Sequence, residues 1–209
     1  TNCPGTSASF SVSATGTGVS YQWHKGASAI VGQTGSSLVL TNVSATDVGT
    51  YSVVVSGTCG TALTESASLA LNEEVVVASV PVSLTNCPGA SASFSVNASG
   101  TELSYQWYKE GSALSGQTSN SLTLASVSAA DDGLYSVVVT GVCGNSVSNS
   151  ASLTVNEDLA IAVVPASATN CPATTASFSV GATGTALEYQ WYKDGSILPG
   201  QTNSSLILN

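Results

Sequence analysis

Short stretches in which apolar residues alternate with hydroxyl-bearing residues run through the whole chain. In residues 7–13, Phe10 and Val12 fall on one face of an extended segment and serines fall on the other. Strict alternation of this kind predicts a half-buried β-strand. Gly, Asn and Ser separate the stretches, and no segment shows the 3.6-residue period of a helix. The pattern therefore predicts an all-β protein.

Five clear strands are expected in the first part of the chain. They lie at residues 7–13, 19–23, 37–40, 47–55 and 66–71. Strands this short and this evenly spaced are typical of a sandwich of two packed sheets.

The same pattern returns with a period of 84 residues. Cys3, Cys87 and Cys171 keep this spacing, and the three tryptophans keep it as well. A fixed long period predicts an array of similar domains, and such arrays usually space, display or polymerise rather than catalyse.

The period divides the chain into three domains. Residues 1–72 form a first domain with a shortened opening strand, and residues 73–156 form a linker and a second domain. Residues 157–209 form a linker and part of a third domain that lacks its last two strands. We expect opening strands at residues 80–86 and 164–170, each with a proline suited to an edge position. The simplest interpretation is a window from a longer array; the alternative is that another chain completes the third domain.

A sequence motif narrows the fold. Trp23 is followed by Leu38, Leu40 and Asp47-x-Gly49-x-Tyr51, and Asp131-x-Gly133-x-Tyr135 follows Trp107 in the same way. This order resembles immunoglobulin-like domains of the I-set kind. The sequences Ala-Ser-Phe-Ser-Val at residues 8–12 and Tyr-Gln-Trp at residues 21–23 are similar to strands in the tandem immunoglobulin-like repeats of large bacterial surface and secreted proteins. The resemblance covers nearly the whole chain and implies tandem immunoglobulin-like β-sandwiches, but it leaves function open.

The resemblance also assigns structural roles. Tyr51 and Tyr135 should form tyrosine corners, whose hydroxyls bond to the backbone of the preceding turn. Asp47 and Asp131 should cap that turn through backbone hydrogen bonds, because their usual arginine partner is absent. Valines replace the central disulfide of antibody-type domains. The expected core positions are Val12, Trp23, Tyr51, Val53, Val96, Trp107, Tyr135, Val137 and Trp191.

The five cysteines predict disulfides and an oxidising compartment, because they are periodic and form no CxxC pair. In the implied fold, Cys3 lies beside the turn between strands A and B, and Cys59 lies in the hairpin between strands F and G. These turns are at opposite poles of the sandwich, which puts the two sulfurs on the order of 30 Å apart. A disulfide needs Cα atoms within about 7 Å.

In a head-to-tail array, the A–B pole of one domain faces the F–G pole of the next. We therefore expect an inter-domain Cys3–Cys143 bridge, with Cys59, Cys87 and Cys171 pairing to domains or chains outside these residues. Three alternatives remain open: bridges between neighbouring chains, a Cys3–Cys59 bridge within one domain, and free thiols.

Charge excludes several classes of function. Only 7% of residues are charged, against about 25% in a typical protein, and the net charge is −9. The three lysines share one repeat position and there is no arginine, which argues against nucleic acid and anionic membranes. No apolar run approaches the roughly 20 residues that span a bilayer. His24 is the only histidine, so we expect neither a zinc site nor an enzyme. We expect His24 and Lys25 to face solvent.

Paired carboxylates recur in the linkers between consecutive domains. They are Glu73, Glu74, Glu157 and Asp158. Oxygen-rich linkers of this kind can bind calcium, but two carboxylates and a neighbouring amide are too few ligands on their own. We therefore expect a solvated linker and no cofactor, with calcium as the alternative.

The function predicted is structural. We expect a segment of a long extracellular array that forms a fibre, filament, stalk or surface layer, self-associates with other copies, and has joints stiffened by disulfides. The rival is an adhesin that binds glycan or protein through exposed strands, for example at a face with Gln22, His24, Gln106 and Tyr108. A third class is an accessory module of a secreted enzyme.

Overall fold

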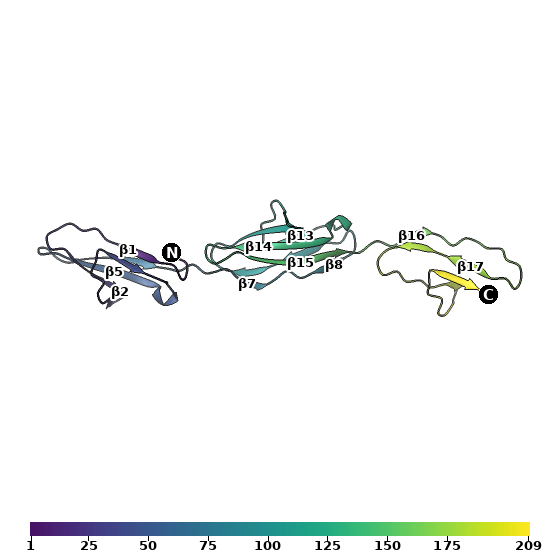
Figure 1. Cartoon of the computed structure of the whole chain (residues 1–209), viewed down its shortest axis with the longest axis horizontal. Coiled ribbons are helices and arrows are strands. Elements are labelled where there is room, and N and C mark those ends of the chain that lie inside the picture. Colours follow the sequence, from purple (N-terminus) through teal and green to yellow (C-terminus); the bar gives the residue numbers. More distant parts are fainter.

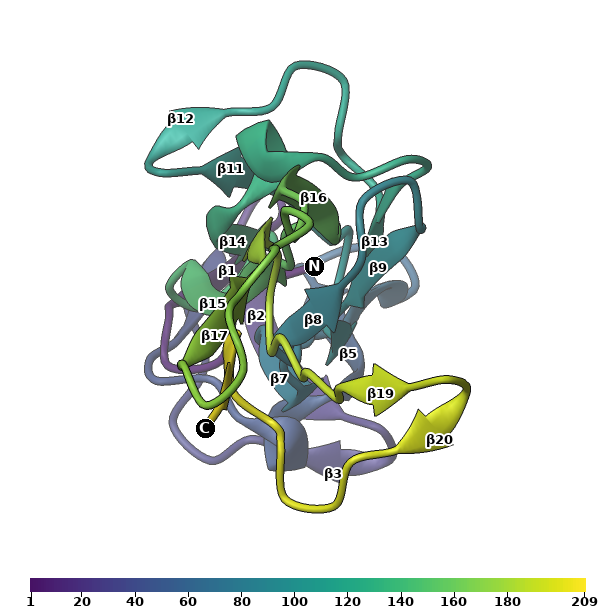
Figure 2. The same ribbon diagram turned by 90° about the vertical axis from the view of Figure 1, so that its right-hand side faces the viewer.

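Three β-sandwich domains follow one another in a row in the computed structural model, which describes residues 1–209 (Figure 1). Short linkers join the domains, and viewed along the row they overlap closely (Figure 2). The only helical turns are two 3-10 turns, η1 (Ala45–Asp47) and η2 (Ala129–Asp131). No helix is both long and apolar enough to cross a membrane.

The second domain has the most complete sandwich. One sheet has five strands in the order β12-β11-β14-β15-β8, and the opposite face is built from the pairs β13–β9 and β10–β7. The strands are β7 (Val76–Ser79), β8 (Leu84–Asn86), β9 (Ala92–Ser95), β10 (Asn97–Ser99), β11 (Ser104–Lys109), β12 (Ser112–Ala113), β13 (Ser121–Leu124), β14 (Gly133–Thr140) and β15 (Val147–Val155).

The opening strand of this domain is split in two, which corrects the single strand expected at residues 80–86. β7 pairs antiparallel with β10 on one sheet, whereas β8 pairs parallel with β15 on the other. Pro81 lies between them and is buried. Proline has no N–H to give to a ladder, so the chain leaves one sheet there and joins the other.

The first and third domains contain parts of the same plan. In the first, the sheet β3-β2-β5-β6 faces the pair β1–β4; in the third, three strand pairs remain. The first-domain strands are β1 (Ala8–Ser11), β2 (Ser20–Lys25), β3 (Ser28–Ala29), β4 (Ser37–Leu40), β5 (Gly49–Ser56) and β6 (Leu63–Leu69). The third-domain strands are β16 (Ala160–Val163), β17 (Ala176–Ser179), β18 (Gly181–Thr183), β19 (Tyr192–Lys193), β20 (Ser196–Ile197) and β21 (Ser205–Leu208).

A tryptophan lies at the centre of each of the two fuller cores. Trp107 is completely buried, and its Nε1 donates a hydrogen bond to the Ser119 carbonyl at 2.9 Å. The Phe94 ring stacks on Tyr135 with centroids 5.1 Å apart. The buried expected core positions are Trp23, Tyr51, Val53, Val96, Trp107, Tyr135 and Val137.

Two expected core positions differ from the rest. Val12 and Trp191 are only half-buried. Val12 precedes residues 13–15, which form no strand in the first domain, whereas their counterpart β10 pairs with β7 in the second. Trp191 has no counterpart of β14 and β15 over it. Their exposure therefore follows from missing neighbours rather than from their own strand position.

The turns before β5 and β14 are built as the motif implied. The Tyr135 hydroxyl donates to the Asp131 carbonyl at 2.8 Å, and Tyr51 makes the same bond to Asp47 at 2.7 Å. The Asp131 carboxylate accepts hydrogen bonds from the Ser128 N–H and hydroxyl, both at 2.8 Å. These bonds close a capping box around the 3-10 turn.

Lys25 does not simply extend into solvent, which corrects the expectation for this position. Its ammonium lies 5.6 Å from the centroid of the Tyr51 ring and donates to the Thr46 carbonyl. Lys109 repeats the arrangement over Tyr135. The lysine therefore holds the 3-10 turn against the tyrosine by a cation–π contact and a charge-assisted hydrogen bond.

Acid should weaken this turn. The hydrogen bond from the Ser44 N–H lowers the pKa of Asp47 more than any other contact, followed by that from the Ser44 hydroxyl, and Ser128 does the same to Asp131. A lowered pKa in the folded state contributes stability that is present above about pH 4 and is lost as pH falls through the folded pKa. In urea titrations from pH 5 to pH 2, we expect the Asp47→Asn, Asp131→Asn double variant to lose less stability than the parent. An identical loss would exclude these carboxylates as the cause.

Candidate functional site

The joint between the first two domains is the most heavily bonded feature outside the cores. Cys3, at the A–B pole of the first domain, is bonded by a disulfide to Cys143, in the F–G hairpin of the second. Their Cα atoms are 5.5 Å apart although 140 residues separate them in sequence. Cys143 is buried in the joint, at 2% exposure. Cys59, Cys87 and Cys171 are exposed free thiols.

The linker at this joint is held by hydrogen bonds to both neighbouring loops of the second domain. The Glu73 N–H donates to the Thr101 hydroxyl at 2.7 Å, and the Thr101 N–H donates back to the Glu73 carbonyl at 3.1 Å. The Val75 N–H donates to the Cys143 carbonyl at 3.3 Å. Residues 73–75 are therefore fixed before β7 begins.

The side chain of Val75 occupies a socket whose walls include two glycines. A Cβ atom on Gly141 would lie 2.8 Å from a methyl carbon of Val75, and one on Gly100 would lie 3.1 Å from the Glu74 carbonyl oxygen. Real Cβ atoms almost never approach another atom as closely as 2.8 Å, and 3.1 Å is closer than most Cβ contacts. Gly100 also has φ of +147°, a region that other residues rarely adopt. Glycine is thus required at both positions for the linker to dock.

Filling this socket should loosen the joint. We expect Gly141→Ala to destabilise the second domain by about 1–3 kcal/mol, because the added methyl group overpacks against Val75. Gly57→Ala in the first domain is the matched control. There the added Cβ would lie no closer than 3.5 Å to another atom, so stability should not change. Urea unfolding of both variants gives the comparison, and equal effects would contradict the socket.

The second joint repeats the linker contacts. The Glu157 N–H donates to the Thr185 hydroxyl at 2.7 Å, and the Thr185 N–H donates to the Glu157 carbonyl at 3.2 Å. A Cβ atom on Gly184 would lie 3.1 Å from the Leu159 Cα. The linker contacts are thus repeated at both joints.

These joint residues could have been found in the sequence but were not. The pairs Gly16-Thr17, Gly100-Thr101 and Gly184-Thr185 keep the 84-residue spacing. The spacing alone does not single them out, since Gly and Thr are abundant throughout the chain.

The linker carboxylates have no cluster of further metal-ligating side chains around them in the structure. Nowhere in residues 1–209 do three or more His, Cys, Asp or Glu side chains gather as a metal ion requires. Glu73 and Glu157 instead use their backbone groups to bind the next domain.

The face of β2 and β11 that was considered for ligand binding is partly used by the fold itself. The Gln22 side-chain amide donates to the carbonyls of Trp23 and Ile30, both at 2.9 Å, and Gln106 makes the equivalent bonds at 2.8 Å. His24 and Tyr108 are half-buried on the same strands. Each glutamine thus bonds to the backbone that follows the neighbouring short strand, β3 or β12, and does not project freely into solvent.

Known proteins share this architecture. Residues 75–155 match the immunoglobulin I-set domain. An I-band fragment of titin is similar in structure, with a TM-score of 0.77 and 20% identity, over 99% of this chain and 83% of that one. Immunoglobulin domains 1–5 of Sidekick-1 match with a TM-score of 0.51 and 20% identity, over 94% of this chain and 47% of that one.

A curated relative is the muscle M-line assembly protein unc-89 of Caenorhabditis elegans. It is 27% identical over 171 residues, which cover 73% of this chain but 2% of that protein. The chain therefore spans a small part of this relative's length, and a bacterial source gains no support. The repeats are thus immunoglobulin-like β-sandwich domains joined in tandem, and the middle one matches the immunoglobulin I-set model.

Proposed function

We propose that the chain is a structural segment of an extracellular array, in which disulfide-locked joints hold immunoglobulin-like domains pole to pole to build a fibre, filament, stalk or surface layer. The observation that carries the proposal is the first joint. There a disulfide, three linker hydrogen bonds and the Val75 socket act on one short connection. Such a joint restricts the angle between neighbouring domains, which a flexible linker leaves free.

Repetition of the joint supports a role in an array. The threonine and glycine that receive the linker recur at the second joint, as does the carboxylate that begins it. The length and stiffness of a row of domains depend on all of its joints, so similar joints favour such a role. A binding site, by contrast, can lie on a single domain and does not require the joints to be alike. The name of unc-89 also describes an assembly protein, which is consistent with a structural role here.

The disulfide supports an extracellular location. Disulfide bonds persist in oxidising compartments, and the reducing cytosol keeps most thiols free. The abundance of Ser, Thr and Gly with few charges would permit close lateral contact between copies. Adhesion is the rival function, but two of the side chains that it would use, Gln22 and Gln106, already bond to their own backbone.

Shape and ligand binding separate the two functions. Small-angle X-ray scattering and electron microscopy of the oxidised chain should show a rod with a narrow range of angles at the first joint. A glycan array probed with the same sample should show no binding. Freely jointed beads, or glycan binding that Tyr108→Ala abolishes, would contradict the structural role and favour adhesion.

A further inference from the structure

One sheet edge is left without a neighbouring strand in every domain. The edge strands are β4 in the first domain, β13 in the second and β21 in the third. Each pairs on one side only, with β1, β9 and β17 respectively. Residues 114–120, which precede β13, form no strand beside it, and neither do residues 30–36 before β4. The open edge is therefore a property of the repeat itself.

The register of β13 shows which backbone groups face outward along this edge. The Val96 N–H donates to the Asn120 carbonyl at 2.9 Å. Bonded pairs alternate along an antiparallel ladder, so Leu122 faces its partner strand β9. The N–H and C=O groups of Ser121 and Thr123 point the other way, where no strand lies. The edge strands β4 and β21 show the same alternation.

The sheet that contains this edge carries no charged residue, in a chain whose net charge is −9. Its strands are β1 and β4 in the first domain, β7, β9, β10 and β13 in the second, and β16, β17, β18 and β21 in the third. Charged residues lie on the opposite sheet, as Lys25, Glu65 and Lys109 do, or in turns and linkers. Two like-charged copies can therefore approach each other at the uncharged sheet with the least repulsion.

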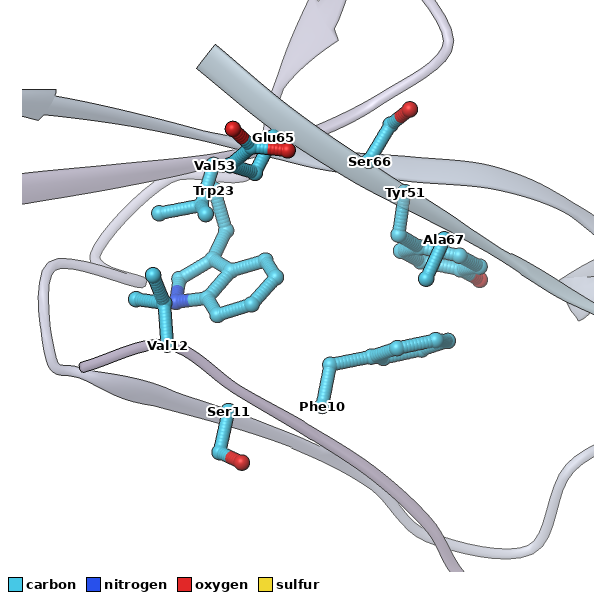
Figure 3. Close-up of a pocket in the computed structure, with 9 residues that line it drawn as sticks. All are labelled: Phe10, Ser11, Val12, Trp23, Tyr51, Val53, Glu65, Ser66 and Ala67. Carbon is cyan, nitrogen blue, oxygen red and sulfur yellow. The ribbon is translucent and has the colours of Figure 1, made fainter. Parts of the chain in front are cut away.

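Alternation places small polar side chains on the outer face of the same sheet. Figure 3 shows this in the first domain, where Phe10 points towards Tyr51 and Ser11 points away from the core. In the second domain, the Ser93 Oγ and the Thr123 Oγ1 lie 3.2 Å apart across neighbouring strands. No bulky or charged side chain therefore stands in the way of a further strand at the open edge.

The other sheet edges of the second domain are protected against further pairing. β12 is two residues long and β8 is three residues long. β7 has an irregular register against β10 and is followed by Pro81. Short, irregular or proline-flanked edges resist the addition of a strand. By contrast, β13 is regular over its four residues and has neither proline nor charge.

We propose that β13 pairs antiparallel with β13 of a second copy of this chain, and that β4 and β21 pair in the same way with their own counterparts. Thr123 of each copy exchanges both backbone hydrogen bonds with Thr123 of the other, and Ser121 pairs with Ala125. The two sheets then continue into one sheet across the copies. A two-fold axis relates the paired domains, so the two rows run in opposite directions.

The chemistry of the edge favours a second copy over a different partner. An uncharged edge offers no ion pair to a charged partner. It offers unpaired backbone groups, hydroxyls and a few apolar side chains, such as Val39, which is 57% exposed. A strand of the same character satisfies these groups, and every copy carries one in each domain. An array repeats the edge many times, so weak contacts between copies add together.

Successive domains present their edges on different sides of the row. Viewed along the row, the equivalent short strands β3 and β12 lie on opposite sides (Figure 2). Because each edge strand keeps its place within its domain, the open edges turn with the domains. One chain therefore meets different neighbours through its first and second domains, which builds a layer or bundle and not a closed pair.

This inference rests on the proposed array function, and association of the full chain tests it. Cys59, Cys87 and Cys171 are first changed to serine, so that only non-covalent contacts are measured. Sedimentation equilibrium should show reversible association at concentrations up to about 1 mM, the weak end of specific binding. A chain that stays monomeric over this range would overturn the inference. Scattering from dilute monomers still reports separately on the stiff joint of the proposed function.

Opposite charges at the centre of each edge give the sharpest comparison. One variant combines Val39→Lys, Thr123→Lys and Ile207→Lys, and the other has glutamate at the same three positions. These side chains are exposed, so both variants should keep their strand circular dichroism. Each variant alone should lose about tenfold in association constant, because like charges meet across the two-fold axis. An equimolar mixture should recover the parental value, because each lysine then faces a glutamate.

Lysines on the opposite sheet provide the matched control. Thr64→Lys, Ser68→Lys and Thr154→Lys add the same charge at exposed strand positions away from the edge. This variant should associate as the parent does. Equal losses in the edge and control variants would overturn the inference. So would a mixture of the two edge variants that associates no better than either of them alone.

Discussion

Replacing Cys3 and Cys143 together by serine is expected to cost about 5 kcal/mol of stability toward complete unfolding. The bond closes a loop across 140 residues, and the loop-entropy model gives roughly this value for so long a loop. Both cysteines lie outside the two hydrophobic clusters, so each sandwich should still fold. The double variant should therefore retain its strand circular dichroism and unfold at lower guanidinium concentration.

A matched control isolates the joint. Cys59 occupies the repeat position of Cys143, and Cys87 occupies that of Cys3, but both are free. Replacing these two by serine, at concentrations where the chain is monomeric, should leave the unfolding midpoint unchanged. If the two double variants behave alike, the bridge contributes nothing and the joint is held by the linker contacts alone.

Trp107→Ala is expected to cost about 3–5 kcal/mol, the usual range for removing a large aromatic side chain from a packed core. Trp107 has no exposed surface, and its indole N–H bonds to the Ser119 carbonyl. The variant therefore loses burial, leaves a cavity and leaves that carbonyl without its partner. Urea unfolding followed by circular dichroism should show the transition of the second domain moving to lower concentration.

Trp191→Ala provides the comparison at the same repeat position. Its indole makes the equivalent bond, to the Asn203 carbonyl, but the ring is only half-buried. It should cost clearly less than Trp107→Ala. Equal costs would mean that strands β14 and β15 contribute little to the environment of the tryptophan.

Alternation and period were enough to predict the sandwich and its repetition, because they depend on residues that are neighbours in sequence. Trp107 and Val137 lie where their strand positions put them, inside the core. Val12 has the same alternation, yet it is half-buried, because burial also requires the segment that covers the strand. The split at Pro81 was missed for a related reason: a proline indicates an edge but does not say which sheet the chain joins afterwards.

The joint was predictable only in outline. Strand polarity indicates which poles face each other, whereas the socket depends on how closely Val75 approaches Gly141 after folding. In a chain with 20 glycines, one glycine that is needed for close approach looks like any turn residue. Lys25 was misjudged because its strand-end position does not show that a carbonyl and an aromatic ring lie within its reach.

The position of the first-joint disulfide determines how the row would respond to being stretched from its ends. Tension entering at the N-terminus crosses from Cys3 directly to Cys143, so the residues between them carry none of the load. That loop would span on the order of 450–500 Å if extended, at 3.3–3.6 Å per residue. Reduction of this one disulfide would place the loop between Cys3 and Cys143 under load, so that its length becomes available when the domains unfold. The extensibility of the first two domains would then depend on redox state.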